Sequence, residues 1–318
     1  MLTSQQVKDF AKQHGADLAG IASMDRFEGA PPQMDPRHIF PDAQALIALG
    51  FRIPRGCFRG IEEGTYFNAY PAMGYGGLNL RDIPITLRAV CLFLEDYGYE
   101  GVPVLPVDTM SSADITDGNI VARKSVAPDR PAPDVMVHFR LAAVAAGLGE
   151  IGYSKMLLTP EFGPRQRIAL VITDAPLAPD PLFDGQICDR CMMCVRECPG
   201  KAISATETVK TTVAGKQLEW GKLDVARCSL AYSAGAPPVL SPFAPEDFDF
   251  EAEVNYENPY AGLEKIEYSR GGPAFYFHLA ASGGARGCIR ACMMHLEEEG
   301  RIQARFKYPF RRREPWSR

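Results

Sequence analysis

Apolar residues recur at helical spacing in three segments of the first half of the chain. In residues 3–14, Val7 and Ala11 fall on one face, and a Thr-Ser pair at the start is placed to cap the first turn. Residues 82–97 and 135–147 also carry apolar side chains three or four positions apart. This periodicity predicts a helix over each of the three segments.

Short continuous apolar runs alternate with these helices. The runs at 17–23, 45–51, 101–108 and 167–174 are four to eight residues long, which is typical of buried strands. The glycine-rich and aromatic stretch at 54–77 shows neither period, and we expect a long ordered loop there. Helices mixed with strands in this order predict an α+β fold or an α/β fold for this part of the chain.

Two proline-containing stretches interrupt the pattern. Residues 111–134 are polar and predict a surface loop, whereas the proline-rich stretch 175–185 predicts a domain boundary. We therefore expect a first domain over residues 1–180 and a second over residues 181–318, which ends in a basic and aromatic tail.

Composition narrows the class of protein. The chain has 318 residues, a net charge of −5, 46% hydrophobic and 23% charged residues, which is ordinary for a globular protein and argues against nucleic acid as the main partner. No apolar run approaches the roughly 20 residues of a membrane helix, and the N-terminus shows no secretion signal. These features predict a cytoplasmic protein without a membrane partner.

The cysteines carry the strongest chemical signal. Four of the nine follow the spacing C-x2-C-x2-C-x3-C-P from Cys188 through Cys191 and Cys194 to Cys198. This spacing is typical of [4Fe–4S] ferredoxin motifs, in which the fourth cysteine binds the other of two clusters. Zinc is the alternative, but zinc sites usually use two separated pairs of ligands. The run therefore predicts an iron–sulfur cluster and a role in electron transfer.

A second cluster needs ligands further along the chain, and Cys228, Cys288 and Cys292 are available. We expect Cys292 to join the first three cysteines of the run and Cys198 to join the other two. This arrangement is one ligand short, because Ala285 stands where a ferredoxin-like motif would place a cysteine. The second cluster then has a solvent or other non-cysteine ligand such as His295, or has three irons, or takes Cys57. Ordinary core packing is the alternative for Cys57 and is expected for Cys91.

Longer stretches resemble a known family. The segment AAGLGEIGYSKMLLTPEFGPRQRIALVITDAPLAPDP with the cysteine run, the opening VKDFAKQHGADLAGIAS and the segment VARCSLAY resemble the epoxyqueuosine reductases and reductive dehalogenases. The resemblance implies a nitroreductase-like α/β domain that binds cobalamin and substrate, followed by a ferredoxin-like domain with two iron–sulfur clusters. The clusters would pass electrons from a donor such as ferredoxin or flavodoxin to the corrinoid, which would reduce a small organic molecule. A non-catalytic electron-transfer protein and a tRNA-modifying reductase are the alternatives.

The resemblance also implies roles for individual residues. Residues of the GLGEIG and TPEFGPR segments would approach the cofactor: Gly147, Gly149, Gly152, Thr159, Gly163 and Arg165. The candidate proton donors are Asp108, Tyr153, Lys155 and His138. Besides the missing cysteine of the second cluster, the absent export signal and a long insertion after Asp108, the sequence departs from the family in two motifs. The aspartate motif of the epoxyqueuosine reductases is matched only in its first half, Val107-Asp108, and Glu150 in GLGE resembles the dehalogenases instead.

Overall fold

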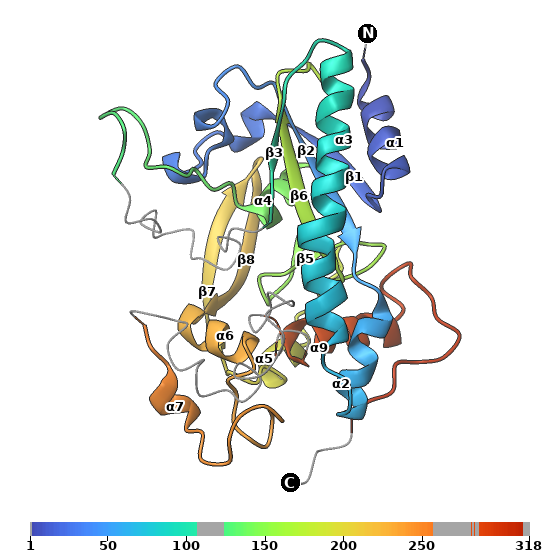
Figure 1. The fold of residues 1–318 in the computed structure, drawn as a ribbon, viewed down its shortest axis with the longest axis vertical. Helices are drawn as coiled ribbons and strands as arrows, with labels where there is room; N and C mark the ends of the chain where they lie inside the picture. Colours follow the sequence, from blue (N-terminus) through green and yellow to red (C-terminus); the bar gives the residue numbers. More distant parts are fainter. Residues whose placement is uncertain (1, 107–123, 257–280, 282, 284–285, 314–318) are drawn as a thin grey trace.

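The structure is a computed structural model that describes residues 2–106, 124–256, 281, 283 and 286–313. Helices and strands are mixed along the chain, and one four-stranded sheet lies at its centre (Figure 1). None of the helices in these ranges is both long enough and apolar enough to cross a bilayer.

The central sheet is antiparallel throughout, which favours the α+β alternative. Its strands lie in the order β1-β2-β6-β3, and Ile47 of β2 is paired with Ile21 on one side and with Val171 on the other. Every residue of β2 except its last, Arg52, is buried, because helices cover both faces of the sheet. The strands are β1 (Leu18–Ser23), β2 (Ala45–Arg52), β3 (Gly101–Val104) and β6 (Gln166–Thr173).

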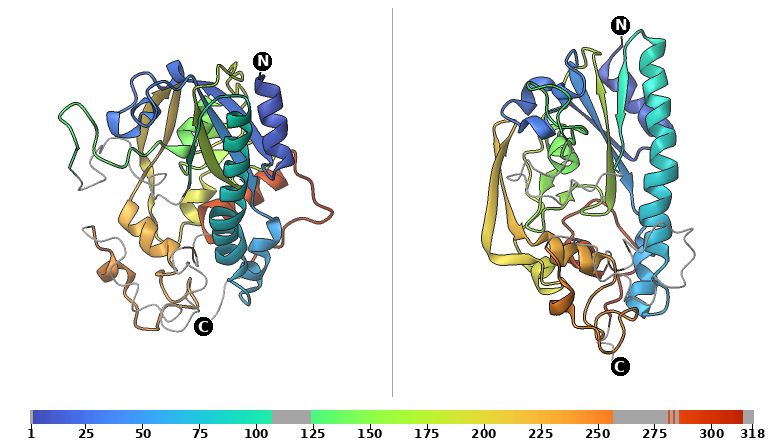
Figure 2. Two further views of the ribbon diagram at one scale, coloured as in Figure 1. Left: turned by 45° about the horizontal axis from the view of Figure 1, so that its top comes forward. Right: turned by 60° about the vertical axis from the view of Figure 1, so that its left-hand side comes forward.

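Successive residues of the strands face opposite layers. Ile47 and Leu49 pack with helices α1 and α3, whereas Leu46 and Ala48 pack with helix α4 on the other face. The right-hand view of Figure 2 shows these layers in order, with a long hairpin outside α4. The helices are α1 (Ser4–Gln13), α3 (Ile83–Asp96) and α4 (Phe139–Ala145).

Most of the predicted elements are confirmed. Helix α1 begins after Thr3, whose side chain forms a capping box with Gln6. The expected helix over 135–147 is shorter than predicted, because it begins at Phe139, after the extended cap residue His138, and residues 135–137 are not helical. The strand expected over 101–108 ends at Val104, and residues 107 and 108 lie outside the described residues.

The prediction of a loop over 54–77 is wrong. This stretch forms the 3₁₀ turn η4 and the short helix α2, and the wide helix η5 then runs directly into α3. Glycines weaken its helical pattern, but Tyr70, Gly74 and Leu78 are buried in the core, and this packing favours the helix. The bounds are η4 (Arg55–Phe58), α2 (Arg59–Glu63) and η5 (Tyr70–Asp82).

The second half contains a hairpin that the sequence analysis missed. Strands β7 and β8 are joined at Ala214 and Gly215, both with positive φ, as a tight hairpin turn requires. Trp220 of β8 is 1% exposed and packs in the same core as α4. The elements of this half are α5 (Met193–Arg196), β7 (Ile203–Val213), β8 (Lys216–Leu223), α6 (Val225–Tyr232), α7 (Phe250–Glu253) and α9 (Cys288–Glu298).

Both halves contribute to the same hydrophobic cores. Met293 of α9 and Phe310 of the tail belong to the core that α1, α3 and β2 form. The boundary near residue 180 stays a prediction. The minor elements are β4 (Glu150–Ile151), β5 (Leu157–Leu158), and the 3₁₀ turns η1 (Met24–Phe27), η2 (Pro32–Met34) and η3 (Pro36–His38).

Candidate functional site

Four cysteines line one small cavity between helix α9 and residues 188–198, which we call the cysteine loop. Cys188, Cys191 and Cys194 come from the loop and from α5, and Cys292 comes from α9, which packs against α5. Burial raises the pKa of Cys292 well above its usual range, and the neighbouring thiols of Cys188 and Cys194 raise it further. We call these four residues the first cysteine group. The spacing assigns these four residues to the first cluster, and their role as ligands stays a prediction.

The backbone around this group is shaped for it. Arg190 and Met192 have positive φ, so the chain turns sharply between the cysteines. The amide of Tyr153 donates to the Cys188 sulfur at 3.4 Å. Glu150 accepts two backbone N–H bonds through one carboxylate oxygen, from Ile187 at 2.7 Å and from Cys188 at 2.5 Å. Glu150 therefore fixes the start of the cysteine loop.

Three further cysteines form a second group: Cys198, Cys228 and Cys288. Burial raises the pKa of Cys228 to about 12, and Cys288 and Cys198 are the thiols that add to this shift. Burial likewise raises the pKa of Cys288 to about 11, with Cys198 contributing. The amide of Ala202 donates to the Cys198 sulfur at 3.3 Å. The fourth cysteine of the run thus belongs to the second group, next to α6 and α9.

The residues considered for the missing ligand fall elsewhere or outside the described residues. His295 forms a 2.7 Å bond with Asp189, and the ligand atoms of both residues lie within 4.8 Å of that of Cys191, so His295 accompanies the first group. Cys57 is buried in the core, and this burial raises the pKa of its thiol, although the Gly74 backbone and the Arg165 charge oppose the shift. Ala285 lies outside the described residues. Cys91 is a core residue of α3, as expected, and burial raises its pKa to about 11.

Polar side chains, two of them buried and three half-buried, lie near the second group, and the sequence analysis missed them. We call this set the polar centre: Tyr70, Asn79, Arg140, Arg167 and Tyr232. Arg167 donates to the Asn79 side-chain oxygen at 3.1 Å and forms a hydrogen bond with Tyr232. Burial raises the pKa of Tyr232 well above its usual range, although Arg167 opposes the shift. Two signals were available, because Arg167 ends the TPEFGPRQR segment and Tyr232 ends VARCSLAY.

Arg140 of the polar centre interacts electrostatically with two thiols of the second cysteine group, Cys288 and Cys228. Burial lowers the pKa of Arg140, whereas thiolates at Cys288 and Cys228 would raise it. Two half-buried arginines favour negative charge next to them, such as that of thiolates or of a cluster. Within the described part of the chain, the Tyr70 hydroxyl and the Asn79 side-chain nitrogen have no hydrogen-bond partner. Buried polar atoms of this kind are rare, and they leave hydrogen-bonding capacity for a polar ligand.

The glycines that the resemblance assigns to a cofactor are crowded by the chain itself. A side chain at Gly149 would lie 1.9 Å from the Leu158 carbonyl oxygen, and one at Gly147 would lie 2.2 Å from the Pro181 carbonyl oxygen. A side chain at Gly152 would also meet Leu158, at 2.8 Å. Internal packing accounts for these three glycines, and their role towards a cofactor stays a prediction.

The other residues of this predicted set are also engaged within the fold. Thr159 is fully buried, and its hydroxyl accepts a hydrogen bond from the Phe162 amide. Its backbone pairs with Gly163 across a β-bridge. Arg165 is 1% exposed and donates to the Ile53 carbonyl at 2.8 Å, while its Nε and one terminal nitrogen have no partner among the described residues. Arg165 therefore has N–H donors that could bind a ligand, whereas the Thr159 hydroxyl and the Gly163 backbone are engaged within the fold.

The predicted proton donors are dispersed. Asp108 lies outside the described residues. Tyr153 lies against the first cysteine group, and its hydroxyl donates to the Ser204 carbonyl at 3.0 Å. Lys155 is 2% exposed with its ammonium over the Trp220 ring. His138 caps α4, and burial lowers its pKa well below the usual range.

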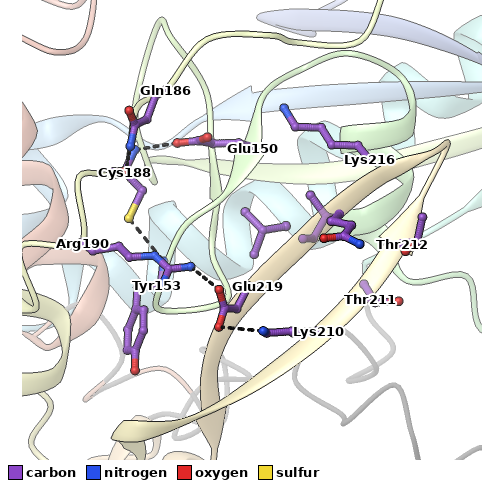
Figure 3. Close-up of a pocket in the computed structure, with 13 residues that line it drawn as sticks. Glu150, Tyr153, Gln186, Cys188, Arg190, Lys210, Thr211, Thr212, Lys216 and Glu219 are labelled. Carbon is purple, nitrogen blue, oxygen red and sulfur yellow. Dashed lines mark hydrogen bonds and ion pairs between the residues drawn. The ribbon is translucent and has the colours of Figure 1, made fainter.

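A polar cavity opens next to Cys188 between the cysteine loop and the β7–β8 hairpin (Figure 3). Its charged side chains are largely paired with one another. Arg190 contacts Glu219 at 2.6 Å and Lys210 lies 3.9 Å from the same carboxylate. Two cations thus share the Glu219 carboxylate, so these ion pairs leave a small positive excess in the cavity.

Comparison with known proteins gives local and distant similarity. No family model matches the chain. Over 65 residues the chain is 46% identical to the tetrachloroethene reductive dehalogenase of Sulfurospirillum multivorans and 52% identical to that of Desulfitobacterium hafniense, covering 20% of this chain and 13% and 12% of theirs. Over 252 residues it is 23% identical to the epoxyqueuosine reductase of Bacillus cereus, covering 70% of this chain and 54% of that enzyme. These matches span at most about half of each relative's length.

The fold is also similar to a solved structure. The catabolic reductive dehalogenase NpRdhA superposes with a TM-score of 0.51 at 18% identity, over 94% of this chain and 37% of that protein. The similarity supports a common fold across nearly the whole chain. Together with the local sequence matches, it supports the resemblance of the chain to the reductive dehalogenases and the epoxyqueuosine reductases, as an outlying relative of both.

Proposed function

We propose that the chain is an iron–sulfur reductase in which two clusters lead electrons to a reduction site at the polar centre. The observation that carries this proposal is the gathering of seven cysteines in two adjacent groups, which meet at Cys288. The second group lies near half-buried arginines and tyrosines of the polar centre. The cysteine cavity and the N–H bonds to Cys188 and Cys198 fit a [4Fe–4S] cluster at the first group and an iron–sulfur cluster with three cysteine ligands at the second.

A corrinoid at the polar centre is part of the same proposal. The unpartnered polar atoms of Tyr70 and Asn79, next to Arg167, fit the edge of a polar cofactor or substrate. When bound, the clusters supply single electrons and the corrinoid supplies a strongly reducing cobalt. The proposed arrangement is a nitroreductase-like cofactor domain followed by a ferredoxin-like domain, acting on a small organic molecule.

The chain's own residues would manage charge and protons at this site. Arg140 and Arg167 offset the negative charge that accumulates when electrons arrive. The Tyr232 hydroxyl holds a proton through its high pKa, and its bond to Arg167 orients it. The fully buried Tyr70 and Asn79 mark the driest part of this site, where less water would compete for reactive intermediates.

Metal analysis of protein purified without oxygen tests the proposal. We expect iron for two clusters and bound cobalt, with both cluster signals in electron paramagnetic resonance after reduction. Cys228→Ser should lose the second signal and about half of the iron, because it removes one of three cysteine ligands. Cys91→Ser is the matched control, since Cys91 is a core thiol of α3, and it should keep both signals.

Three outcomes would refute parts of the proposal. Zinc in place of iron would end the cluster assignment. Equal iron in wild type and Cys228→Ser would end the second cluster. Two intact clusters without cobalt, in protein that reduces no halogenated or epoxide test compound, would instead favour a non-catalytic electron-transfer protein.

A further inference from the structure

Helix α9 brings a histidine as well as a cysteine to the first cysteine group. Cys292 and His295 are three positions apart on α9, so their side chains lie on the same helical face. Both residues line the small cavity that the first three cysteines of the cysteine loop also line. The proposed function gives His295 no role, although its imidazole belongs to this lining.

An aspartate of the cysteine loop fixes the His295 ring. His295 Nε2 donates to Asp189 Oδ2 at 2.7 Å, and Asp189 Oδ1 accepts the Cys191 backbone N–H at 3.1 Å. The His295 side chain is only 15% exposed, so protein contacts rather than water set its position. A carboxylate bonded to one ring nitrogen is the arrangement that orients metal-binding histidines, because it leaves the other ring nitrogen for the metal.

The same three residues place potential ligand atoms close together. One ring nitrogen of His295, one carboxylate oxygen of Asp189 and the Cys191 sulfur lie within 4.8 Å of one another. Metal–sulfur bonds are about 2.3 Å long and metal–nitrogen bonds about 2.0 Å, so two ligands of one tetrahedral ion stand roughly 3.5 Å apart. A side-chain movement on the order of 1 Å therefore brings His295 to an iron that Cys191 holds in the shared cavity.

Imidazole is a suitable ligand for the iron of a cluster. Histidines replace two cysteines on one iron of Rieske centres, whose potential is higher than that of comparable clusters bound only by cysteine. The position beside Cys191 is also specific. Among the described residues, Asp189, Cys191 and His295 are the one group of three potential metal ligands gathered this closely, and Cys194 is not part of it.

We propose that His295, oriented by Asp189, is an alternate ligand for the iron that Cys191 binds in the first cluster. The inference rests on the proposed function, because it presumes a [4Fe–4S] cluster at the first cysteine group. In the exchange, the iron–sulfur bond to Cys191 breaks and its electron pair leaves with the thiolate, while the lone pair of an imidazole nitrogen forms the new bond. No electron enters or leaves the cluster. The form with three cysteines and one histidine is easier to reduce, because a neutral ligand replaces an anionic one.

Replacing Cys191 with alanine forces the exchange. In the full chain, purified without oxygen and reduced with dithionite, Cys191→Ala should keep the electron paramagnetic resonance signal of the first cluster. Pulsed measurements should detect strong coupling to a directly bonded nitrogen, which wild type lacks, and the midpoint potential of this cluster should rise. Adding His295→Ala to this variant should abolish both the signal and the nitrogen coupling.

Cys194→Ala is the matched control, because Cys194 lines the same cavity but lies outside the group of Asp189 and His295. It should lose the first signal and show no nitrogen coupling. A Cys191→Ala protein without the first signal, or with the signal but without nitrogen coupling, would overturn the alternate ligand. Nitrogen coupling in Cys194→Ala would also overturn it, because the ligand would then not depend on the geometry at Cys191. Wild-type protein without iron would instead refute the proposed function.

A second measurement does not depend on the cysteine variants and decides the matter if Cys191→Ala is insoluble. His295→Gln keeps an N–H donor for Asp189 but has no imidazole. EDTA should remove iron from the first cluster of this variant several times faster than from wild type, because no alternate ligand holds the iron when the Cys191 thiolate dissociates. Equal rates would show that His295 only ties α9 to the cysteine loop, and the proposal would be wrong.

Discussion

Replacing Glu150 with alanine should loosen the start of the cysteine loop. One carboxylate oxygen of Glu150 accepts the backbone N–H groups of Ile187 and Cys188, at 2.7 and 2.5 Å. The substitution leaves both donors without this acceptor. An unsatisfied buried donor costs about 1–3 kcal/mol, and the site is only half-buried, so we expect a loss of about 2–3 kcal/mol in the free energy of unfolding.

This loss is measurable as a melting temperature. Unfolding entropy of about 2.1 cal/mol/K per residue converts it into a fall of roughly 3–5 °C for a chain of this length. Thermal denaturation followed by circular dichroism gives the shift, and iron per chain reports the first cluster. Glu150→Gln keeps an acceptor oxygen but loses its charge, so its shift should be about half as large.

Glu219 provides the matched control, because it lines the same cavity as Glu150 but is paired at the surface with Arg190. Glu219→Ala should leave the melting temperature and the iron content nearly unchanged. If Glu150→Ala has the same melting temperature as Glu219→Ala and keeps its iron, the role assigned to the two N–H bonds is wrong.

Three further predictions concern other parts of the fold. Burial keeps His138 neutral in the native state, whereas the imidazole in the unfolded chain is protonated below about pH 6.5. The free energy of unfolding should therefore fall, below that pH, by up to about 1.4 kcal/mol per pH unit. His138→Gln should remove this pH dependence, measured by urea titrations at several pH values. Gly149→Ala should prevent soluble expression, since its Cβ would lie 1.9 Å from a backbone oxygen, whereas Gly56→Ala meets no atom within 4 Å and should express normally. Arg140→Gln removes a cation beside the second cysteine group and should lower that cluster's midpoint potential, on the order of tens of millivolts, in a redox titration; an unchanged potential would contradict the electrostatic role.

Local sequence patterns determined much of the fold. The apolar periods of residues 3–14 and 82–97 suffice for α1 and α3, because one helical face is buried in each. Continuous apolar runs suffice for β2 and β6, because both faces of the sheet are covered. The cysteine spacing predicts that Cys198 binds a different cluster from the first three cysteines, and this assignment stays a prediction.

Other features depended on contacts between distant segments. The helix over Tyr70–Asp82 forms against a core that its glycine-rich sequence does not announce. The polar centre joins side chains from η5, α4, β6 and α6, and the hydrogen bond between Asp189 and His295 joins the cysteine loop and α9. The sequence by itself thus determined where α1 and α3 form and which of their faces is buried. Only the tertiary structure decided which charges meet, because burial and charge pairing depend on distances between segments far apart along the chain.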